Sequence, residues 1–259
     1  MADEKLRLGG MALANGVLVH GPNAWACAVR APDGTLKTAS AYKHFRAARV
    51  EQPLLRGPAR VLEVFTLLPE VRRRLPEARL PFERPAVLAA MATGALVTQV
   101  VRGSKLGPAS KELLAGIASL APAAVALRGT TLAAYHGAEH ISIGSYEHGE
   151  RREKEHERCG THLVGPLLMT MAAGNVLAAK APQELRGPAR LAASLGALAT
   201  STEIFAWMSR HPDSRLTKML AKPGHELQHR LATEEPTPEQ LEVAEAALAE
   251  CLRLEADVG

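Results

Sequence analysis

The chain has 259 residues, of which 47% are hydrophobic and only 3% aromatic, and its formal net charge is +4. This length is sufficient for a substantial hydrophobic core. With so few aromatic rings, the core must consist mainly of Ala, Leu and Val, which favours closely packed helices. The chain has no long basic tract interleaved with aromatic residues, which argues against nucleic-acid binding. The three cysteines are too few and too scattered for a disulfide framework, and they fit a reducing compartment.

The first 45 residues predict a small antiparallel β-element. Turn-forming sequences, of which Pro32-Asp33-Gly34 is the clearest, separate short apolar runs such as Val17-Leu18-Val19. The charged start, Met1 to Lys5, lacks the apolar region of a signal peptide, so no signal peptide is expected.

From about Gly57 the pattern is helical. Three runs, 86–101, 163–179 and 191–208, carry at most one acid and lie at or below the ~17–25 residues that a membrane span needs. Their small residues suit close packing of helices in a bilayer or in a soluble bundle, so composition leaves both open. Residues 111–140 predict two helices separated near Pro122. We treat the chain as a single domain, 1–259, with a β-hairpin element (1–45), a helical core (46–222), and a linker with an amphipathic helix capped by Thr237, Pro238 and Gln240 (223–259).

Residues 136–140 read His-Gly-Ala-Glu-His, the inverted form of the zinc-peptidase helix motif. Residues four apart share one face of a helix, so His136 and His140 can bind one cation, and Glu139 is placed to take a proton from water. More candidate ligands follow in a charged segment, and His156 and Cys159 have a spacing that can chelate one ion. Each of the histidines in that segment, taken singly, is more often an ordinary surface residue.

A second motif competes with the first. Residues 225–229 read His-Glu-Leu-Gln-His, the usual zinc-peptidase spelling, with Glu226 as the base. Pro223-Gly224 directly precedes it, so both imidazoles are expected in the first turns of a helix, beside a solvent-facing linker. On the residues alone the two motifs rank nearly equal.

Several short sequences point to a known family: Gly9-Gly10, Asn15-Gly16-Val17, Gly21-Pro22, Pro32-Asp33-Gly34, Leu55-Arg56-Gly57, Tyr135 to His140, Tyr146-Glu147, His156, Arg158 to Thr161, Glu203, Pro223-Gly224 and Glu235-Pro236. Through nearly its whole length the chain resembles the bacterial YqhQ-like family, which is of unknown function and described as candidate metal-dependent enzymes. The resemblance implies a multi-helix membrane protein with a metal site. It favours the motif at 136–140, because Glu147, His156 and Cys159 belong to the same signature. It also brings forward Glu203, an acid in an apolar segment, which is costly there unless it is paired or bound.

These observations predict a mainly α multi-helix bundle with a small N-terminal antiparallel β-element. The leading hypothesis is a zinc-type hydrolase-like enzyme at the bacterial cytoplasmic membrane, with its metal site toward the cytoplasm and a small-molecule or peptide substrate. Glu139 is the predicted base, and the predicted metal ligands are His136, His140, Glu203, Glu147, His156 and Cys159. Two alternatives stay open: an iron redox enzyme acting on lipid or quinone through His136, His140, His156 and His162, and a non-catalytic scaffold stabilised by metal. A soluble cytoplasmic location and a homo-oligomer also stay open.

Overall fold

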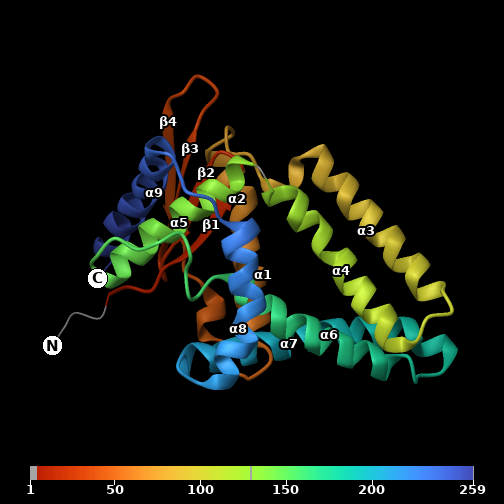
Figure 1. The fold of residues 1–259 in the computed structure, drawn as a ribbon. Coiled ribbons are helices and arrows are strands. Elements are labelled where there is room, and N and C mark those ends of the chain that lie inside the picture. The colour runs from red at the N-terminus through yellow and green to blue at the C-terminus, as the bar shows by residue number, and fades with distance from the viewer. Residues whose placement is uncertain (1–4, 129, 259) are drawn as a thin grey trace.

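The computed structural model describes residues 5–128 and 130–258. Most of the charged start, Met1–Glu4, on which the signal-peptide prediction rests, lies outside the described residues. The main elements are β1 (Gly9–Leu13), β2 (Gly16–His20), β3 (Ala24–Arg30), β4 (Leu36–Tyr42), α1 (Arg56–Phe65), α2 (Leu67–Arg74), α3 (Pro85–Gly103), α4 (Pro108–Leu127), α5 (Thr131–His148), α6 (Val164–Ala178), α7 (Arg186–Arg210), α8 (Arg215–Leu227) and α9 (Pro238–Ala256). A short helical turn, η3 (Gly160–Leu163), precedes α6. The prediction of a mainly helical fold with a small N-terminal antiparallel sheet is confirmed (Figure 1).

The four strands form an antiparallel meander in the order β1-β2-β3-β4, with β1 and β4 at the edges. Alternate side chains of a strand point to opposite faces, so Val17 and Val19 of β2 pack on one side of the sheet and Leu18 on the other. The predicted turn at Pro32-Asp33-Gly34 joins β3 to β4. Gly34 has a φ of 82° there, which glycine adopts without a steric penalty.

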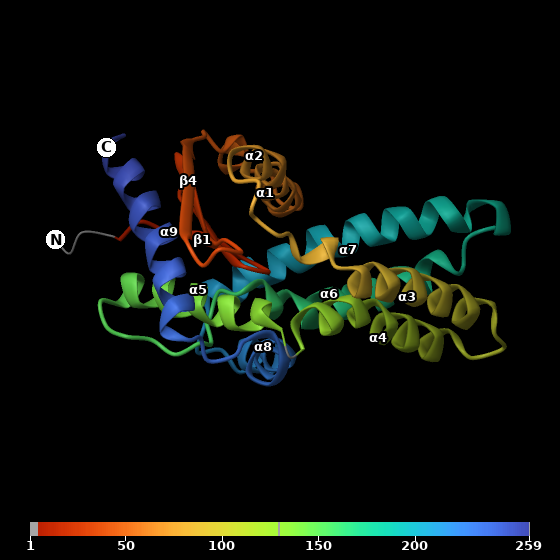
Figure 2. The ribbon, with the colours of Figure 1, turned by 90° about the horizontal axis from the view of Figure 1, so that it is seen from above.

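Helices cover both faces of the sheet. α5 and α9 lie on one face and α2 on the other, with Trp25 of β3 fully buried on the α2 side (Figures 1 and 2). The end of α9 is tied to the turn before β3, because the buried carboxylate of Glu255 accepts the backbone N–H groups of Asn23 and Ala24, each at 2.7 Å. We call the sheet together with α2, α5 and α9 the head.

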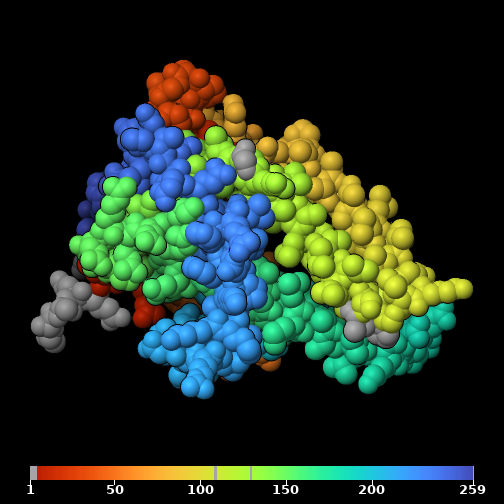
Figure 3. All heavy atoms as spheres, in the orientation of Figure 1, coloured from red at the N-terminus to blue at the C-terminus, as the bar shows by residue number. Residues whose placement is uncertain are grey.

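Two helical hairpins, α3/α4 and α6/α7, project from the head in the same direction (Figure 2). Four helical segments that make up these hairpins are long and apolar enough to cross a membrane, judged by length and composition: Pro85–Gly103, Ser110–Leu127, Gly160–Ala178 and Gln183–Arg210. Their apolar side chains are largely uncovered: only 6% of the apolar window of α3 is buried, and Leu96 is 63% exposed. In Figure 3 the hairpins form the yellow and teal extension on the right of the molecule. Exposed apolar surface of this extent is typical of contact with a membrane or a partner.

Two prolines lie within helices rather than at their ends. α4 continues through Pro122, so the predicted break there is wrong, and the chain turns instead at Arg128, whose ψ is 119°. α8 passes through Pro223, so the prediction that a helix begins after this residue is also wrong. A proline removes one helical hydrogen bond, a cost that packing with neighbouring segments can offset. In α8 the next residue, Gly224, is so close to η3 that a Cβ would stand 2.5 Å from the Thr161 carbonyl oxygen.

The predicted C-terminal helix is confirmed as α9. The Thr237 hydroxyl accepts the N–H of Gln240 at 3.4 Å, and the Gln240 side chain accepts the N–H of Thr237 at 2.9 Å, which is the expected capping box. Apolar residues of α9, including Val243, Ala247 and Cys251, pack in the head.

Candidate metal centre

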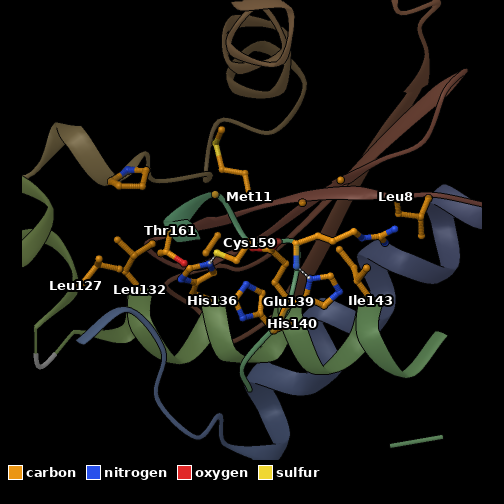
Figure 4. Close-up of a pocket in the computed structure, with 17 residues that line it drawn as sticks. Leu8, Met11, Leu127, Leu132, His136, Glu139, His140, Ile143, Cys159 and Thr161 are labelled. Atoms are coloured by element: carbon orange, nitrogen blue, oxygen red, sulfur yellow. Dashed lines mark hydrogen bonds between the residues drawn. The ribbon is translucent and has the colours of Figure 1, made fainter. Parts of the chain in front are cut away.

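The motif at 136–140 lies on α5, the head helix nearest to β1. His136 and His140 are one helical turn apart, and their ring centroids are 4.3 Å from each other. α5 ends at Gly149, whose φ of 76° is the left-handed conformation that commonly terminates a helix. Both imidazoles project from one face of α5 into the space between this helix and β1 (Figure 4).

Each of these two imidazoles is fixed by a backbone carbonyl. His136 Nδ1 lies 2.8 Å from the oxygen of Ala232, and His140 Nδ1 lies 2.6 Å from the oxygen of Lys154. A carbonyl oxygen only accepts, so Nδ1 carries the proton and Nε2 of the neutral ring is left to bind a cation. Metal-binding histidines are typically oriented in this way. Burial lowers the pKa of His140, opposed by its contact with Cys159, and so favours the neutral ring that a metal needs.

Cys159 completes a group of three ligand atoms. It directly precedes η3, and its Sγ lies 3.5 Å from His136 Nε2. One ligand atom from each of His136, His140 and Cys159 lies within 4.8 Å of the other two, so the group could hold a metal ion. Thiolate and imidazole are ligands that zinc prefers, and three protein ligands beside an open position are typical of a catalytic zinc site.

Glu139 extends from α5 toward β1. Glu139 is 7% exposed, and its carboxylate accepts a hydrogen bond from the backbone N–H of Ala12. Burial raises the pKa of this carboxyl, and the neighbouring His136 and His156 oppose that rise only in part. Gly10 makes room for the side chain, because a Cβ at this position would stand 2.3 Å from a carboxylate oxygen of Glu139. Sequence reasoning missed this role, for which the glycine pair in β1 was the available signal.

Glu147 and His156, two further predicted ligands, lie beside the group but bind each other. His156 Nε2 is 3.2 Å from one carboxylate oxygen of Glu147, and His156 Nδ1 accepts the backbone N–H of Arg158 at 3.2 Å. The Arg158 guanidinium pairs with the other carboxylate oxygen. Burial alone would raise the pKa of Glu147, but the hydrogen bond from His156 and the charge of Arg158 hold it below its usual range. In this arrangement the pair supports the loop that leads to Cys159.

The structure does not bring Glu203 to this group. Glu203 lies on α7, where its carboxylate accepts two hydrogen bonds from the Arg56 guanidinium and one from the N–H of Leu54 at 3.2 Å. An acid in an apolar helix needs a partner, and Arg56 at the start of α1 is that partner. As a metal ligand Glu203 stays a prediction, and its observed contacts instead link α1 to the α6/α7 hairpin.

The competing motif at 225–229 spans the end of α8 and the turn that follows it. The ring centroids of His225 and His229 are 6.5 Å apart, wider than those of His136 and His140. His229 is 64% exposed and lies 3.0 Å from a carboxylate oxygen of Glu155. These two histidines are not in the group of three ligand atoms.

Gln228, between those two histidines, anchors the loop that presents Cys159. The side chain of Gln228 is fully buried; its oxygen accepts the N–H of His156 at 3.0 Å, and its nitrogen donates to the Thr161 hydroxyl at 2.7 Å. A ring nitrogen of His162 lies 3.3 Å from the same amide, and His162 is not in the group of three ligand atoms. The Gln228 amide therefore holds the loop at His156 and at Thr161, on either side of Cys159. The family resemblance includes Leu227-Gln228, but sequence reasoning assigned Gln228 no role, because the contacts of a buried amide have no signature in a single sequence.

A cavity of about 430 Å³ lies over the three ligand atoms. Leu8 and the β1 residues Gly9 to Ala12 form one wall, and the segment 156–161 contributes another. Figure 4 shows Leu127 and Leu132 toward one end of the cavity, Leu8 and Ile143 toward the other, and the polar group between them. The volume is in the range of small-molecule and peptide subsites.

Comparisons with known proteins cover this part of the chain. Residues 130–254 match the family model described as "Protein of unknown function (DUF1385)". The "Uncharacterized protein YqhQ" of Bacillus subtilis (strain 168) is 35% identical over 133 residues, which cover 47% of this chain and 41% of the relative. Residues 130–254 are therefore similar to the YqhQ-like family of unknown function. The alignment thus spans less than half of the relative's length, and no solved structure matches the chain.

The matched residues 130–254 contain α5 to α8 and most of α9, and therefore all three residues of the His-His-Cys group. The sheet lies outside them, although Gly10 and Ala12 of β1 contact Glu139. The family description specifies no reaction, so the chemistry of the site has to be argued from its geometry.

Proposed function

We propose that this protein is a zinc-dependent hydrolase-like enzyme held at the bacterial cytoplasmic membrane. The observation that carries the proposal is the orientation of two histidines: each Nδ1 is fixed by a carbonyl, so that both Nε2 atoms are left for one ion together with Cys159. Three such ligands fit zinc and leave a position open toward the cavity. Glu147, His156 and Gln228 support the loop that presents the thiol.

In this proposal Glu139 moves the proton. A bound zinc ion would supply Lewis-acid polarisation of a carbonyl and would lower the pKa of water. The carboxylate of Glu139 lines the same cavity as the two histidines, so it can take a proton from water there and pass it to a leaving group. The contact with Ala12 and the space left by Gly10 fix its position.

Two features support the location. The four hairpin helices expose apolar side chains that a bilayer would cover. All three cysteines are free, and Cys159 must stay a reduced thiol to bind a metal, which favours the cytoplasmic side. Fractionation tests the first point, since the protein should stay with membranes after a carbonate wash. Labelling of Cys159 by a membrane-impermeant maleimide in inverted but not in right-side-out vesicles tests the second.

Elemental analysis of the purified full-length protein tests the metal. We expect an equimolar amount of zinc, most of which is lost in His136→Ala and in Cys159→Ser. His148→Ala is a matched control, because this histidine is on the same helix and outside the ligand group. Equal zinc in the wild type and in both ligand variants would contradict the proposal. Iron with a visible chromophore would favour the redox alternative instead.

Glu139→Gln separates catalysis from a structural clamp. The substitution keeps size and polarity but removes the base. A catalytic role predicts retained zinc and fold with loss of the cellular role when the variant replaces the native protein. A cellular role that survives with zinc bound would show that the ion serves structure alone.

A further inference from the structure

The free edge of the sheet forms one wall of the metal cavity. β1 pairs with β2 on one side only. The N–H of Ala12 faces Glu139, and alternate residues of a strand direct their backbone groups to the same side, so those of Gly10 also face outward. Within residues 5–128 and 130–258, no group hydrogen-bonds the outward N–H or C=O of Gly10, and this glycine is exposed. At Gly10 the edge is therefore open to a further strand beside the ligand group, whereas the N–H of Ala12 is already bound by Glu139.

Apolar side chains flank the ligand group on both sides along this wall (Figure 4). Leu127 and Leu132 lie toward one end, and Leu8 and Ile143 toward the other. A lipid with one polar head and one apolar tail would use an apolar wall at one end only. Arg158 also lines the cavity, but its guanidinium is already paired with a carboxylate. The arrangement fits a chain molecule that lies lengthwise, with its reacting bond at the centre.

We propose that the substrate is an extended, apolar polypeptide segment that adds to β1 as a further strand. The inference rests on the proposed function and names its substrate class. When a peptide adds to a sheet edge, main-chain hydrogen bonds give affinity and pockets for side chains give specificity. Gly10 supplies the main-chain donor and acceptor, and the two apolar ends of the cavity receive side chains on either side of the reacting amide.

The chemistry of this arrangement is amide hydrolysis. Water adds its oxygen to the carbonyl carbon of the segment, the C–N bond breaks, and the nitrogen leaves as an amine. Glu139 takes the proton of the water and delivers it to that nitrogen, so the products are a carboxylic acid and an amine and no other reactant is needed. Gly10 serves both parts of the site, because it leaves its edge groups open and leaves space for the Glu139 carboxylate.

Backbone N-methylation of a probe peptide tests the strand pairing on unaltered protein. The probe is a fluorescent six-residue Leu/Ala peptide amide, and its binding to the full-length protein in detergent is followed by polarisation. Strand addition predicts that N-methyl groups at alternate positions weaken binding about tenfold, through a lost hydrogen bond and a clash with the edge, while the intervening positions tolerate them. A flat response along the peptide would overturn the proposal.

A pair of protein variants controls for partition of the probe into detergent. Leu127→Gln alters the cavity wall and should weaken binding several-fold. Leu96→Gln alters an exposed hairpin position outside the cavity and should not change it. Equal binding by both variants would overturn the assignment of the apolar wall.

Hydroxamates separate this inference from the metal proposal. Acetohydroxamate reports the metal alone, and a leucyl-peptide hydroxamate should bind at least tenfold more tightly than octanoyl hydroxamate of similar length. Tighter binding of the octanoyl compound would overturn the peptide assignment in favour of a lipid and leave the metal proposal intact. If the alternating N-methyl pattern holds but no hydroxamate binds, the metal proposal fails and the strand addition stands.

Discussion

The head and the two hairpins are built from similar apolar residues, but the head buries these side chains and the hairpins expose them. In the head, the Val, Leu and Ala side chains of β2 and β3 are buried on both faces of the sheet under α2, α5 and α9. In the hairpins, side chains such as Leu96, Leu113 and Leu195 point outward and stay more than half exposed. Burial drives folding of the head in water, whereas the hairpins need an apolar surrounding to cover their outer face. The metal cavity lies where the two regions meet, since Leu127 of α4 is part of its wall.

The largest expected difference between the head and the hairpins follows from removing a large side chain from each region. Trp25→Ala should lower the free energy of unfolding of the head by about 3–5 kcal/mol, because Trp25 is fully buried. Leu195→Ala, at a position 62% exposed, should change it by less than about 0.5 kcal/mol. Denaturant titration of the detergent-solubilised variants measures both. Similar losses of unfolding free energy in the two variants would mean that the outer face of α7 at Leu195 is buried in the solubilised protein.

A charge on the outer face of a hairpin should show the reverse pattern. Leu96→Arg would place a guanidinium at the middle of α3, which costs about 2.5–3.5 kcal/mol if the helix crosses a bilayer. Tyr42→Arg, at an exposed position of β4, is the matched control for the head. Membrane retention after a carbonate wash should fall for Leu96→Arg and not for the control. Unchanged retention of both would remove the reason for placing α3 in a membrane.

A buried carboxylate that joins elements of the head has a smaller expected effect. Glu255→Ala leaves the backbone N–H groups of Asn23 and Ala24 without their acceptor, which should cost about 1–3 kcal/mol. Glu245→Ala removes an acid from the exposed face of the same helix and should be nearly neutral. Thermal unfolding compares the two variants. Equal melting temperatures would show that the link between α9 and the turn before β3 does not stabilise the head.

Local sequence rules predicted those parts of the fold that depend on local physics. The turn at Gly34 and the cap at Thr237 follow from conformational and hydrogen-bonding preferences within a few residues, and both are present. Pro122 and Pro223 were misjudged, because a helix can continue through a proline when packing with distant segments offsets the lost bond. That compensation is tertiary, and a single sequence does not show it.

The same distinction applies to the site. His136 and His140 could be predicted as a pair because helical spacing fixes their common face. The joining of Cys159 to them depends on a loop held by Gln228, and the pairing of Glu203 depends on Arg56, which is far away in the chain. Both depend on contacts between distant segments. A list drawn from ligand residue types therefore also included residues whose observed contacts support a loop or join two helices.

The smallest expected effect concerns the motif with the more familiar spelling. In a variant that combines His225→Ala with His229→Ala, zinc content should stay equimolar and the free energy of unfolding should change by less than about 0.5 kcal/mol, because the two side chains are exposed. Gln228→Ala, in the same turn, should by contrast release the loop before Cys159 and lower zinc affinity about 10–100-fold. Zinc titration against a competing chelator distinguishes the two variants. Loss of zinc from the double-histidine variant alone would transfer the metal to α8 and would contradict the centre on α5. If the double-histidine variant retains zinc and Gln228→Ala loses it, this turn acts by positioning Cys159. Its two histidines then have no part in metal binding.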